Sequence, residues 1–86
     1  MAETETYRDK VESKTFIRFS KRIRDRIYPR LRTNPYFGPN IKRLKGELSS
    51  VHRYRLGDYR LFYIIDASKN IVFVLDIVHR KDAYRK

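Results

Sequence analysis

Apolar and polar side chains alternate along two neighbouring segments, V-H-R-Y-R-L at residues 51–56 and Y-R-L-F-Y-I-I at residues 59–65. Such alternation is typical of half-buried β-strands, because successive side chains of a strand point to opposite faces of the sheet. The two residues between the segments, Gly57 and Asp58, are typical of the turn of a tight β-hairpin. The predicted register pairs Leu56 with Tyr59, Arg55 with Arg60 and Arg53 with Phe62.

A third strand is predicted at Ile71–Val78, after a turn at residues 66–70. Almost every residue of this segment is apolar, which is typical of a strand buried on both faces. A turn that sets Ile65 opposite Ile71 would also set Phe62 opposite Val74 and Arg60 opposite Asp76. In that register Asp76 would lie close enough to orient the side chain of Arg60.

A helical region is predicted between Ser13 and Asn34. Ser13 is a plausible N-cap for a helix that begins at Lys14. Pro29 removes one backbone donor and favours a kink or a fresh turn at that position, so the segment is either one helix or two. Apolar residues recur at intervals of three and four along it, at Phe16, Phe19, Ile23, Ile27 and Leu31.

The remaining segments complete an α+β arrangement. Residues 1–5 are expected to be a disordered acidic tail, and residues 6–86 a single domain. Tyr7–Glu12 alternates weakly and is predicted to be a first strand, with Tyr7 and Val11 pointing inward. Residues 34–40 contain two Pro, one Gly and two Asn and are predicted to be a loop, followed by a short extended segment at Ile41–Lys45. Helices early in the chain and an antiparallel meander at its end favour the α+β class.

The alternation of the strands separates two kinds of side chain. Arg53, Arg55 and Arg60 fall on one face, and the parity of the third strand adds Arg80. Like charges that converge in this way repel each other, so we expect an anion to bind among them. The other face, which is predicted to receive the helices, collects the apolar residues Tyr54, Leu56, Tyr59, Leu61, Tyr63, Phe73 and Leu75, and also His52.

Charge supports an anionic partner. The chain has 21 basic and 10 acidic residues and a formal net charge of +11. Four of the acids lie within residues 1–12, so residues 13–86 alone carry 19 basic and 6 acidic residues. Self-repulsion of this size opposes a compact state, and a nucleic acid or an acidic protein would relieve it.

Other features of the composition exclude several classes of protein. The chain has no Cys, which removes disulfides and thiolate metal sites and fits a reducing cytoplasm. Residues 1–12 lack the basic and apolar regions of a secretory signal. No apolar run exceeds five residues, so we expect no membrane partner.

Arginine is well suited to bind phosphate, because its planar guanidinium donates two parallel hydrogen bonds. The predicted arginine face would therefore bind an RNA backbone or stabilise the charge on a phosphate during cleavage. His79 is a candidate general acid or base, and Tyr84 a candidate for stacking on a base. Phosphate contacts without a chemical role are predicted for the basic residues Lys42, Arg43, Lys45 and Lys81.

Three segments together resemble the RelE/ParE superfamily of toxins from prokaryotic toxin–antitoxin pairs. They are N-P-Y-F-G-P-N-I-K-R-L-K-G at 34–46, H-R-Y-R-L-G-D-Y-R-L-F-Y at 52–63 and H-R-K-D-A-Y-R at 79–85. The resemblance covers residues 7–85. It implies a small microbial-RNase-like fold, with an N-terminal strand and a helical pair packed on one face of an antiparallel sheet.

The RelE branch implies an endoribonuclease that cuts mRNA on the translating ribosome without a metal or other cofactor. In that chemistry the RNA 2′-hydroxyl attacks the adjacent phosphate. By resemblance, Arg60 stabilises the transition-state phosphate, Arg80 lies near the leaving group and Tyr84 orients the substrate.

The chain departs from the family pattern at the activating lysines, which are replaced by Arg53 and Arg55. Arginine stays protonated in proteins, so neither residue is an easy general base, and His79 becomes the best local candidate.

Two other functions are compatible with the sequence. The ParE branch implies a DNA gyrase poison without nuclease activity, and a degenerate member would be a basic RNA-binding protein without catalysis. The family also implies an acidic cognate antitoxin as the partner, besides the ribosome and mRNA.

Overall fold

Five strands form one mixed sheet in the order β1-β5-β4-β3-β2, in a computed structural model that describes residues 1–46 and 50–83. The first strand, β1, runs parallel to β5, and the other neighbouring strands are antiparallel. The predicted α+β class is confirmed. The strands are β1 (Ala2–Glu3), β2 (Ile41–Arg43), β3 (Val51–Leu56), β4 (Tyr59–Asp66) and β5 (Ile71–His79), and the helices are α1 (Glu5–Val11), α2 (Ile17–Arg22), the π-helical η1 (Ile23–Ile27), α3 (Tyr28–Thr33) and α4 (Arg80–Ala83).

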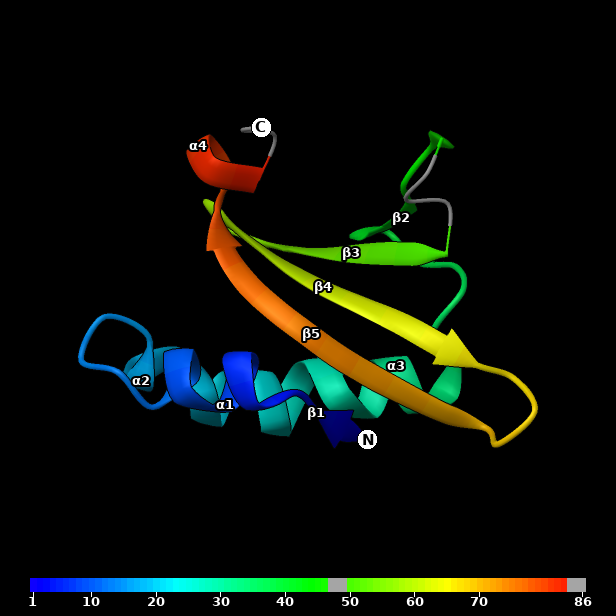
Figure 1. The fold of residues 1–86 in the computed structure, drawn as a ribbon, viewed down its shortest axis with the longest axis horizontal. Helices are drawn as coiled ribbons and strands as arrows, with labels where there is room; N and C mark the ends of the chain where they lie inside the picture. Colours follow the sequence, from blue (N-terminus) through cyan, green and yellow to red (C-terminus); the bar gives the residue numbers. More distant parts are fainter. Residues whose placement is uncertain (47–49, 84–86) are drawn as a thin grey trace.

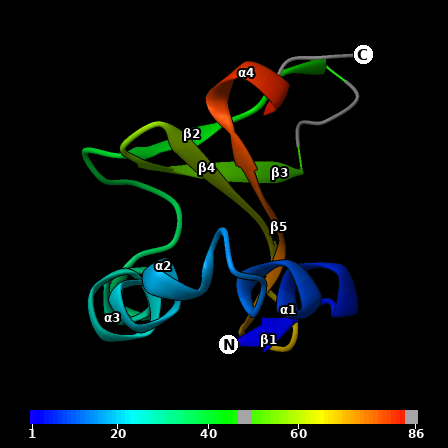
Figure 2. The same ribbon diagram turned by 90° about the vertical axis from the view of Figure 1, so that its left-hand side faces the viewer.

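The helices α1, α2, η1 and α3 lie together on one side of the sheet, whereas α4 lies at the far end of β5 (Figures 1 and 2). The hydrophobic core fills the layer between the sheet and these helices. Phe16 and Phe19 are partly buried and pack against this core, as their spacing predicted. No described helix has the length and apolar character that a membrane crossing requires. The buried core residues are Tyr7, Val11, Ile23, Ile27, Tyr28, Leu31, Tyr54, Leu56, Leu61, Tyr63, Val72, Val74 and Ile77.

The predicted register of the β3–β4 hairpin is confirmed at all three pairs, with Leu56 opposite Tyr59, Arg55 opposite Arg60 and Arg53 opposite Phe62. Gly57 adopts a positive φ of 59° in the turn, a conformation that glycine reaches without a steric penalty.

The predicted register between β4 and β5 is wrong. Asp66, not Ile65, lies opposite Ile71, and the pairing shifts again between Phe62 and Tyr63. As a result Asp76 lies opposite Phe62 and cannot be the partner expected for Arg60. The shift also corrects the expected core, because β5 buries Val72, Val74 and Ile77 rather than Phe73 and Leu75.

The N-terminal segment differs from the expectation as well. The N-terminal strand is Ala2–Glu3, within the residues expected to be a disordered tail, and Tyr7–Val11 belongs to α1 instead of a strand. The backbone N–H of Thr4 donates to the carbonyl of Val74, and its hydroxyl oxygen accepts the N–H of Tyr7 as the N-cap of α1. Thr4 therefore joins the strand to the helix.

The helical region is one continuous rod with a π-helical turn inside it. Its start is later than expected, because Ser13 lies in a turn and the helix begins at Ile17 without a side-chain cap. In η1 the N–H of Tyr28 donates to the carbonyl of Ile23, five residues back. Pro29 lies in the first turn of α3, where its missing donor is tolerated. This position agrees with the prediction that a fresh turn starts at Pro29.

Candidate functional site

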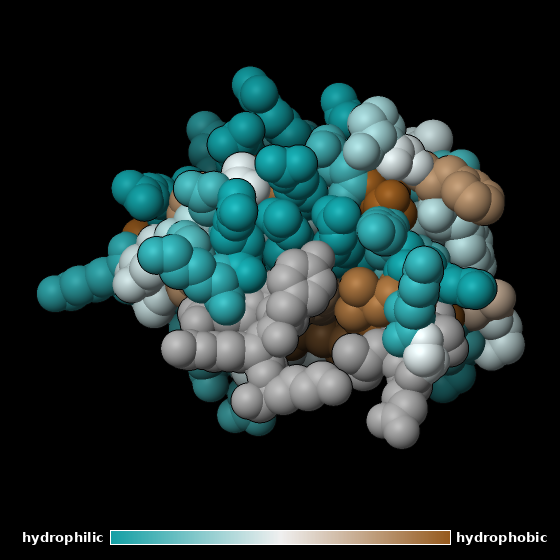
Figure 3. All heavy atoms as spheres, turned by 90° about the horizontal axis from the view of Figure 1, so that it is seen from above, coloured by the Kyte–Doolittle hydropathy of each residue, from teal (hydrophilic) through white to brown (hydrophobic). Residues whose placement is uncertain are grey.

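The face of the sheet away from the core helices carries Arg53, Arg55 and Arg60, which we call the arginine face. Their pairing in the hairpin places all three on the side opposite the buried Tyr54, Leu56 and Leu61. Seen from above in Figure 3, the coloured part of this side of the molecule is mostly hydrophilic, with a few hydrophobic atoms visible between polar ones.

Arg60 is the most buried of the three arginines, with only 8% of its surface exposed. Its Nη1 atom donates to the backbone carbonyls of Gly57 (3.3 Å) and Tyr59 (3.2 Å), which fixes the guanidinium near the hairpin turn. Its Nε atom is buried and has no hydrogen-bond partner among the described residues. An unsatisfied buried donor costs about 1–3 kcal/mol, so an acceptor from outside the described residues would stabilise this group.

Arg53 repeats this feature on the neighbouring strand, because its Nε atom is also buried without a partner in the described part of the chain. Arg55 lies directly opposite Arg60 and is exposed. No described carboxylate forms an ion pair with any of the three. The expected neighbour, Asp76, instead binds Nζ of Lys10 at 2.8 Å. The arginine face therefore has positive charge and unused donors, as a phosphate-binding surface requires.

Arg80 is the first residue of α4 and is exposed, so it does not continue the parity of β5. Its backbone N–H donates to the carbonyl of Asp58 at 2.7 Å, which ties the start of α4 to the hairpin turn. The structure thus places Arg80 beside the turn that also positions Arg60. Tyr84 lies outside the described residues.

The structure does not bring His79 to the arginine face. His79 pairs with Tyr59, whereas Arg60 pairs with Val78, so the two side chains lie on opposite faces of the sheet. The His79 ring makes an edge contact with Tyr59, at 5.2 Å between ring centroids, and Tyr59 in turn contacts Phe16 and Phe19. Its Nδ1 atom accepts the N–H of Lys81 at 3.2 Å, so that lone pair is already occupied.

The four residues predicted to contact phosphate, Lys42, Arg43, Lys45 and Lys81, are all exposed. Lys42 pairs with Arg53 across the β2–β3 ladder, next to the arginine face, and Arg43 pairs with His52 on the other side. Among the described residues no group of three His, Asp or Glu side chains is placed to hold a metal ion.

A second basic surface was missed in the sequence. Arg22, Arg26 and Arg30 line a cavity of about 310 Å³ together with Arg55. Their spacing of four residues was the available signal, since such residues share one face of a helix. The same spacing is also typical of the solvated side of an amphipathic helix, so it does not by itself indicate a cavity.

The aromatic residues of the 34–40 loop do not anchor it. The side chains of Tyr36 and Phe37 are 46% and 79% exposed. The anchors are polar instead, since Oδ1 of Asn34 accepts the backbone N–H groups of both residues. His52, predicted to lie on the face that receives the helices, is buried and stacks on Tyr63.

Comparison with known proteins gives one family and several similar structures. The sequence model of a family described as "ParE toxin of type II toxin-antitoxin system, parDE" matches residues 5–84. No curated protein matches the chain.

Three solved structures resemble the whole fold. The toxin–antitoxin complex RelBE2 from Mycobacterium tuberculosis has a chain with 28% identity and a TM-score of 0.72, over 91% of this chain and 93% of that one. The YoeB/ParE toxin from Agrobacterium tumefaciens has 21% identity and a TM-score of 0.75, over 91% and 94%. The RelB–RelE antitoxin–toxin complex from Methanococcus jannaschii has 24% identity and a TM-score of 0.69, over 98% and 95%. The last two are too distant in sequence to bear on more than the fold.

Proposed function

This chain belongs to the RelE/ParE superfamily of toxins from type II toxin–antitoxin systems, and we propose that within it the protein is an endoribonuclease that cuts mRNA on the translating ribosome. The main support for the proposal is the way in which the side chain of Arg60 is buried and held. Its guanidinium is buried, is held by two backbone carbonyls and keeps a buried Nε donor without a partner in the described chain. A side chain fixed in this way is suited to stabilise charge that develops on a phosphate.

The proposed reaction needs no covalent intermediate with the protein. The 2′-oxygen of the RNA forms a bond to the adjacent phosphorus while the bond from phosphorus to the 5′-oxygen breaks. The products are a 2′,3′-cyclic phosphate and a 5′-hydroxyl, the 2′-proton leaving to solvent and the 5′-oxygen gaining one from it. Arg60 and Arg53 offer buried donors to the phosphate oxygens, and exposed Arg55 and Arg80 add positive charge at the two sides.

The proposal assigns no general base on the arginine face. Arg53 and Arg55 remain protonated and act through their charge, which lowers the energy of a developing 2′-oxyanion. His79 lies on the other face of the sheet with its Nδ1 lone pair occupied. We therefore attribute catalysis to charge stabilisation and to the fixed position of the guanidinium groups.

The second candidate function is poisoning of DNA gyrase without nuclease activity. It is favoured by one specific observation, namely that the matching family is described as ParE toxin. A third possibility, RNA binding without cleavage, shares the arginine face but requires no transition-state stabilisation.

An acidic antitoxin is the partner that we propose for this toxin. Two of the similar structures are described as toxin–antitoxin complexes, and the net charge of +11 favours a partner of opposite sign.

A translating cell-free extract separates the three functions. The protein is added, and the 5′ ends of the mRNA are mapped alongside Arg60→Ala and Arg60→Met, the second of which keeps most of the apolar length of the side chain. We expect cuts in phase with codons for the wild-type protein, and a loss of at least about 100-fold in cleavage rate for both variants, the size seen when one preorganised donor is removed from such a site.

The matched control is Arg8→Ala, because Arg8 is an exposed arginine on α1 outside the arginine face. It should cut at the wild-type rate, and thermal unfolding shows which variants remain folded. Intact mRNA together with gyrase-linked DNA breaks would establish the ParE function instead. If neither mRNA cuts nor DNA breaks appear and the protein still binds RNA, its function is RNA binding without cleavage.

A further inference from the structure

A cavity of about 540 Å³ opens at the edge strand β2, on the side of the molecule that includes the 34–40 loop. This volume is within the range of small-ligand sites. The cavity combines aromatic, basic and imidazole side chains, and none of the described residues that line it is a carboxylate. Its main lining residues are Tyr36, Phe37, Lys42, Arg43, His52 and Ile65.

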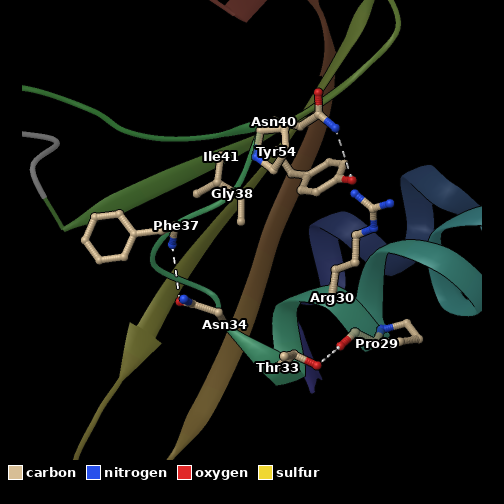
Figure 4. Close-up of a pocket in the computed structure, with 10 residues that line it drawn as sticks. Pro29, Arg30, Thr33, Asn34, Phe37, Gly38, Asn40, Ile41 and Tyr54 are labelled. Carbon is tan, nitrogen blue, oxygen red and sulfur yellow. Dashed lines mark hydrogen bonds between the residues drawn. The ribbon is translucent and has the colours of Figure 1, made fainter.

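The aromatic rings at this cavity are exposed although the loop that carries them is fixed. The carbonyl of Pro35 accepts the hydroxyl of Tyr63 at 2.6 Å, and the N–H of Ile41 donates to the carbonyl of Gly38 at 3.1 Å. Figure 4 shows the Phe37 ring projecting away from Arg30 and Pro29, while its N–H points to Asn34. Phe37 is the most exposed large hydrophobic residue of the described chain, so the loop presents its ring to solvent.

His52 forms the inner wall of the cavity. Its ring stacks on Tyr63 at 5.5 Å between centroids and meets the edge of Tyr36 at 6.1 Å. Only 7% of His52 is exposed, and its Nδ1 atom is buried without a hydrogen-bond partner in the described chain. A ligand with a polar edge would satisfy this atom, which an apolar ligand cannot do.

Positive charge lies at the mouth of the cavity. Lys42 and Arg43 are both exposed on β2, and Lys42 pairs with Arg53 of the arginine face. A flat π-surface, a polar edge and a nearby phosphate occur together in a nucleotide.

We infer that this cavity, which we call the β2 pocket, binds one unpaired base of a single-stranded RNA whose two flanking phosphates lie on Lys42 and on Arg43. The base stacks on Phe37 and Tyr36 and turns its polar edge toward His52. The inference rests on the proposed function only for the choice of RNA as the ligand. An RNA bound at the arginine face would run past β2, which is the neighbour of β3. An acidic peptide would also suit Lys42 and Arg43, but it would leave the exposed rings without a stacking partner.

Binding of short, labelled RNA to the full chain tests the inference by fluorescence anisotropy. The RNA is 2′-O-methylated, so that it cannot be cut by 2′-hydroxyl attack, and it is compared with an abasic strand of the same length and charge. Phe37→Ala should weaken binding of the base-bearing strand by about 5- to 150-fold, the range for loss of one stacked base, and should leave the abasic strand unchanged. Phe37→Trp should retain the wild-type affinity.

Two controls separate stacking from general effects. Ile17→Ala removes another exposed hydrophobic residue, 52% exposed on α2, and should change neither affinity. Lys42→Ala should weaken both strands alike, because it removes only a charge. Because Phe37 is 79% exposed, its replacement should not unfold the domain, which circular dichroism checks directly.

The inference is overturned if Phe37→Ala binds the base-bearing strand as the wild type does, if both strands lose affinity equally, or if the wild type binds no RNA. It is also overturned if Phe37→Ala weakens an acidic antitoxin but not RNA, because the pocket is then a protein-docking site. None of these outcomes depends on cleavage. Failure of the nuclease proposal would appear separately, as intact mRNA in the extract.

Discussion

Arg60 and His79 show how strongly the register of a strand decides which residues can act together. They are close in the fold, at the end of the β4–β5 ladder, but Arg60 pairs with Val78 and His79 with Tyr59. One step along β5 therefore moves a side chain from the arginine face to the core face. The candidate base suggested by the sequence is thereby separated from the phosphate that it would serve.

His79→Asn is expected to reduce the rate of mRNA cleavage by no more than about 3-fold, whereas removal of a general base typically costs 10²–10⁴-fold. Asn keeps a polar group that can accept the N–H of Lys81, and the position lies on the Tyr59 side of the sheet. The rate is measured in the translating extract beside Arg60→Met. A loss of 100-fold or more in His79→Asn would show that the imidazole reaches the substrate after all.

His52 is expected to make stability depend on pH. Burial, and next the charge of Arg43, hold the pKa of His52 below its ordinary value. The unfolded chain, with a His pKa of about 6.5, therefore takes up the proton first as pH falls. The neutral ring's contribution to stability is complete above that value and is lost as the pH drops through the folded-state pKa.

The measurement compares melting temperatures at pH 7.5 and 5.5. His52→Phe, which retains a ring to stack on Tyr63, should lose less melting temperature between the two pH values than the wild type. His79→Asn removes the other histidine and serves as the control. An equal drop in the wild type and His52→Phe would show that other groups cause the pH dependence.

At the scale of elements, local patterns located β2, β3, β4 and β5 but not the N-terminal elements. Tyr7 and Val11 are four residues apart, and this spacing is even, so it fits a strand as well as a helix. The hydrogen bond from the N–H of Tyr7 to the hydroxyl of Thr4 caps the segment as a helix. The strand β1 is too short to show any alternation. A two-residue strand is defined by its partner β5, which no local pattern reveals.

The register between β4 and β5 could not be predicted for a similar reason. Two-residue turns fix a register closely, which is why the β3–β4 pairs were predicted correctly. The longer turn at residues 66–70 allows several registers, and the irregularity at Phe62 and Tyr63 then shifts the pairing. The arginine face was predicted because all three of its strand arginines lie in the hairpin with the tight turn. The exposed position of Phe37 was not predicted, because the exposure of a loop residue depends on the whole fold.

The contact between Tyr28 and Glu3 is expected to hold β1 and α3 together. The buried Tyr28 hydroxyl donates to the half-buried Glu3 carboxylate, and burial raises the pKa of Tyr28. Tyr28→Phe should lower the free energy of unfolding by about 1–2 kcal/mol, because it removes a hydrogen bond to a charged group. Urea denaturation measures the loss.

Tyr36→Phe is the matched control for this prediction, since Tyr36 is 46% exposed and should change stability by less than about 0.5 kcal/mol. Glu3→Gln combined with Tyr28→Phe should cost less than the sum of the single changes, because the two residues share one interaction. Equal stability of Tyr28→Phe and Tyr36→Phe would show that the contact contributes nothing.

On the scale of the whole molecule, charge is distributed unevenly along the chain and around the fold. Acidic residues are most frequent within residues 1–12, while the hairpin and the α2–α3 rod carry arginine. Arg55 belongs to the arginine face and also lines the cavity that contains Arg22, Arg26 and Arg30. The two basic surfaces are therefore continuous around the edge of the sheet and form one positively charged region.

Affinity for single-stranded RNA is therefore expected to fall steeply with salt. Each neutralised phosphate releases counterions and contributes about −0.7 to the slope of log K against log salt, so contacts from four arginines predict a slope near −3. Arg53→Ala and Arg55→Ala should each make the slope less negative by about 0.7, measured by anisotropy with uncleavable RNA. Arg8→Ala, on α1 outside the arginine face, should leave it unchanged. A flat response in the wild type, or an equal change in all three variants, would show that the arginine face does not bind the RNA backbone.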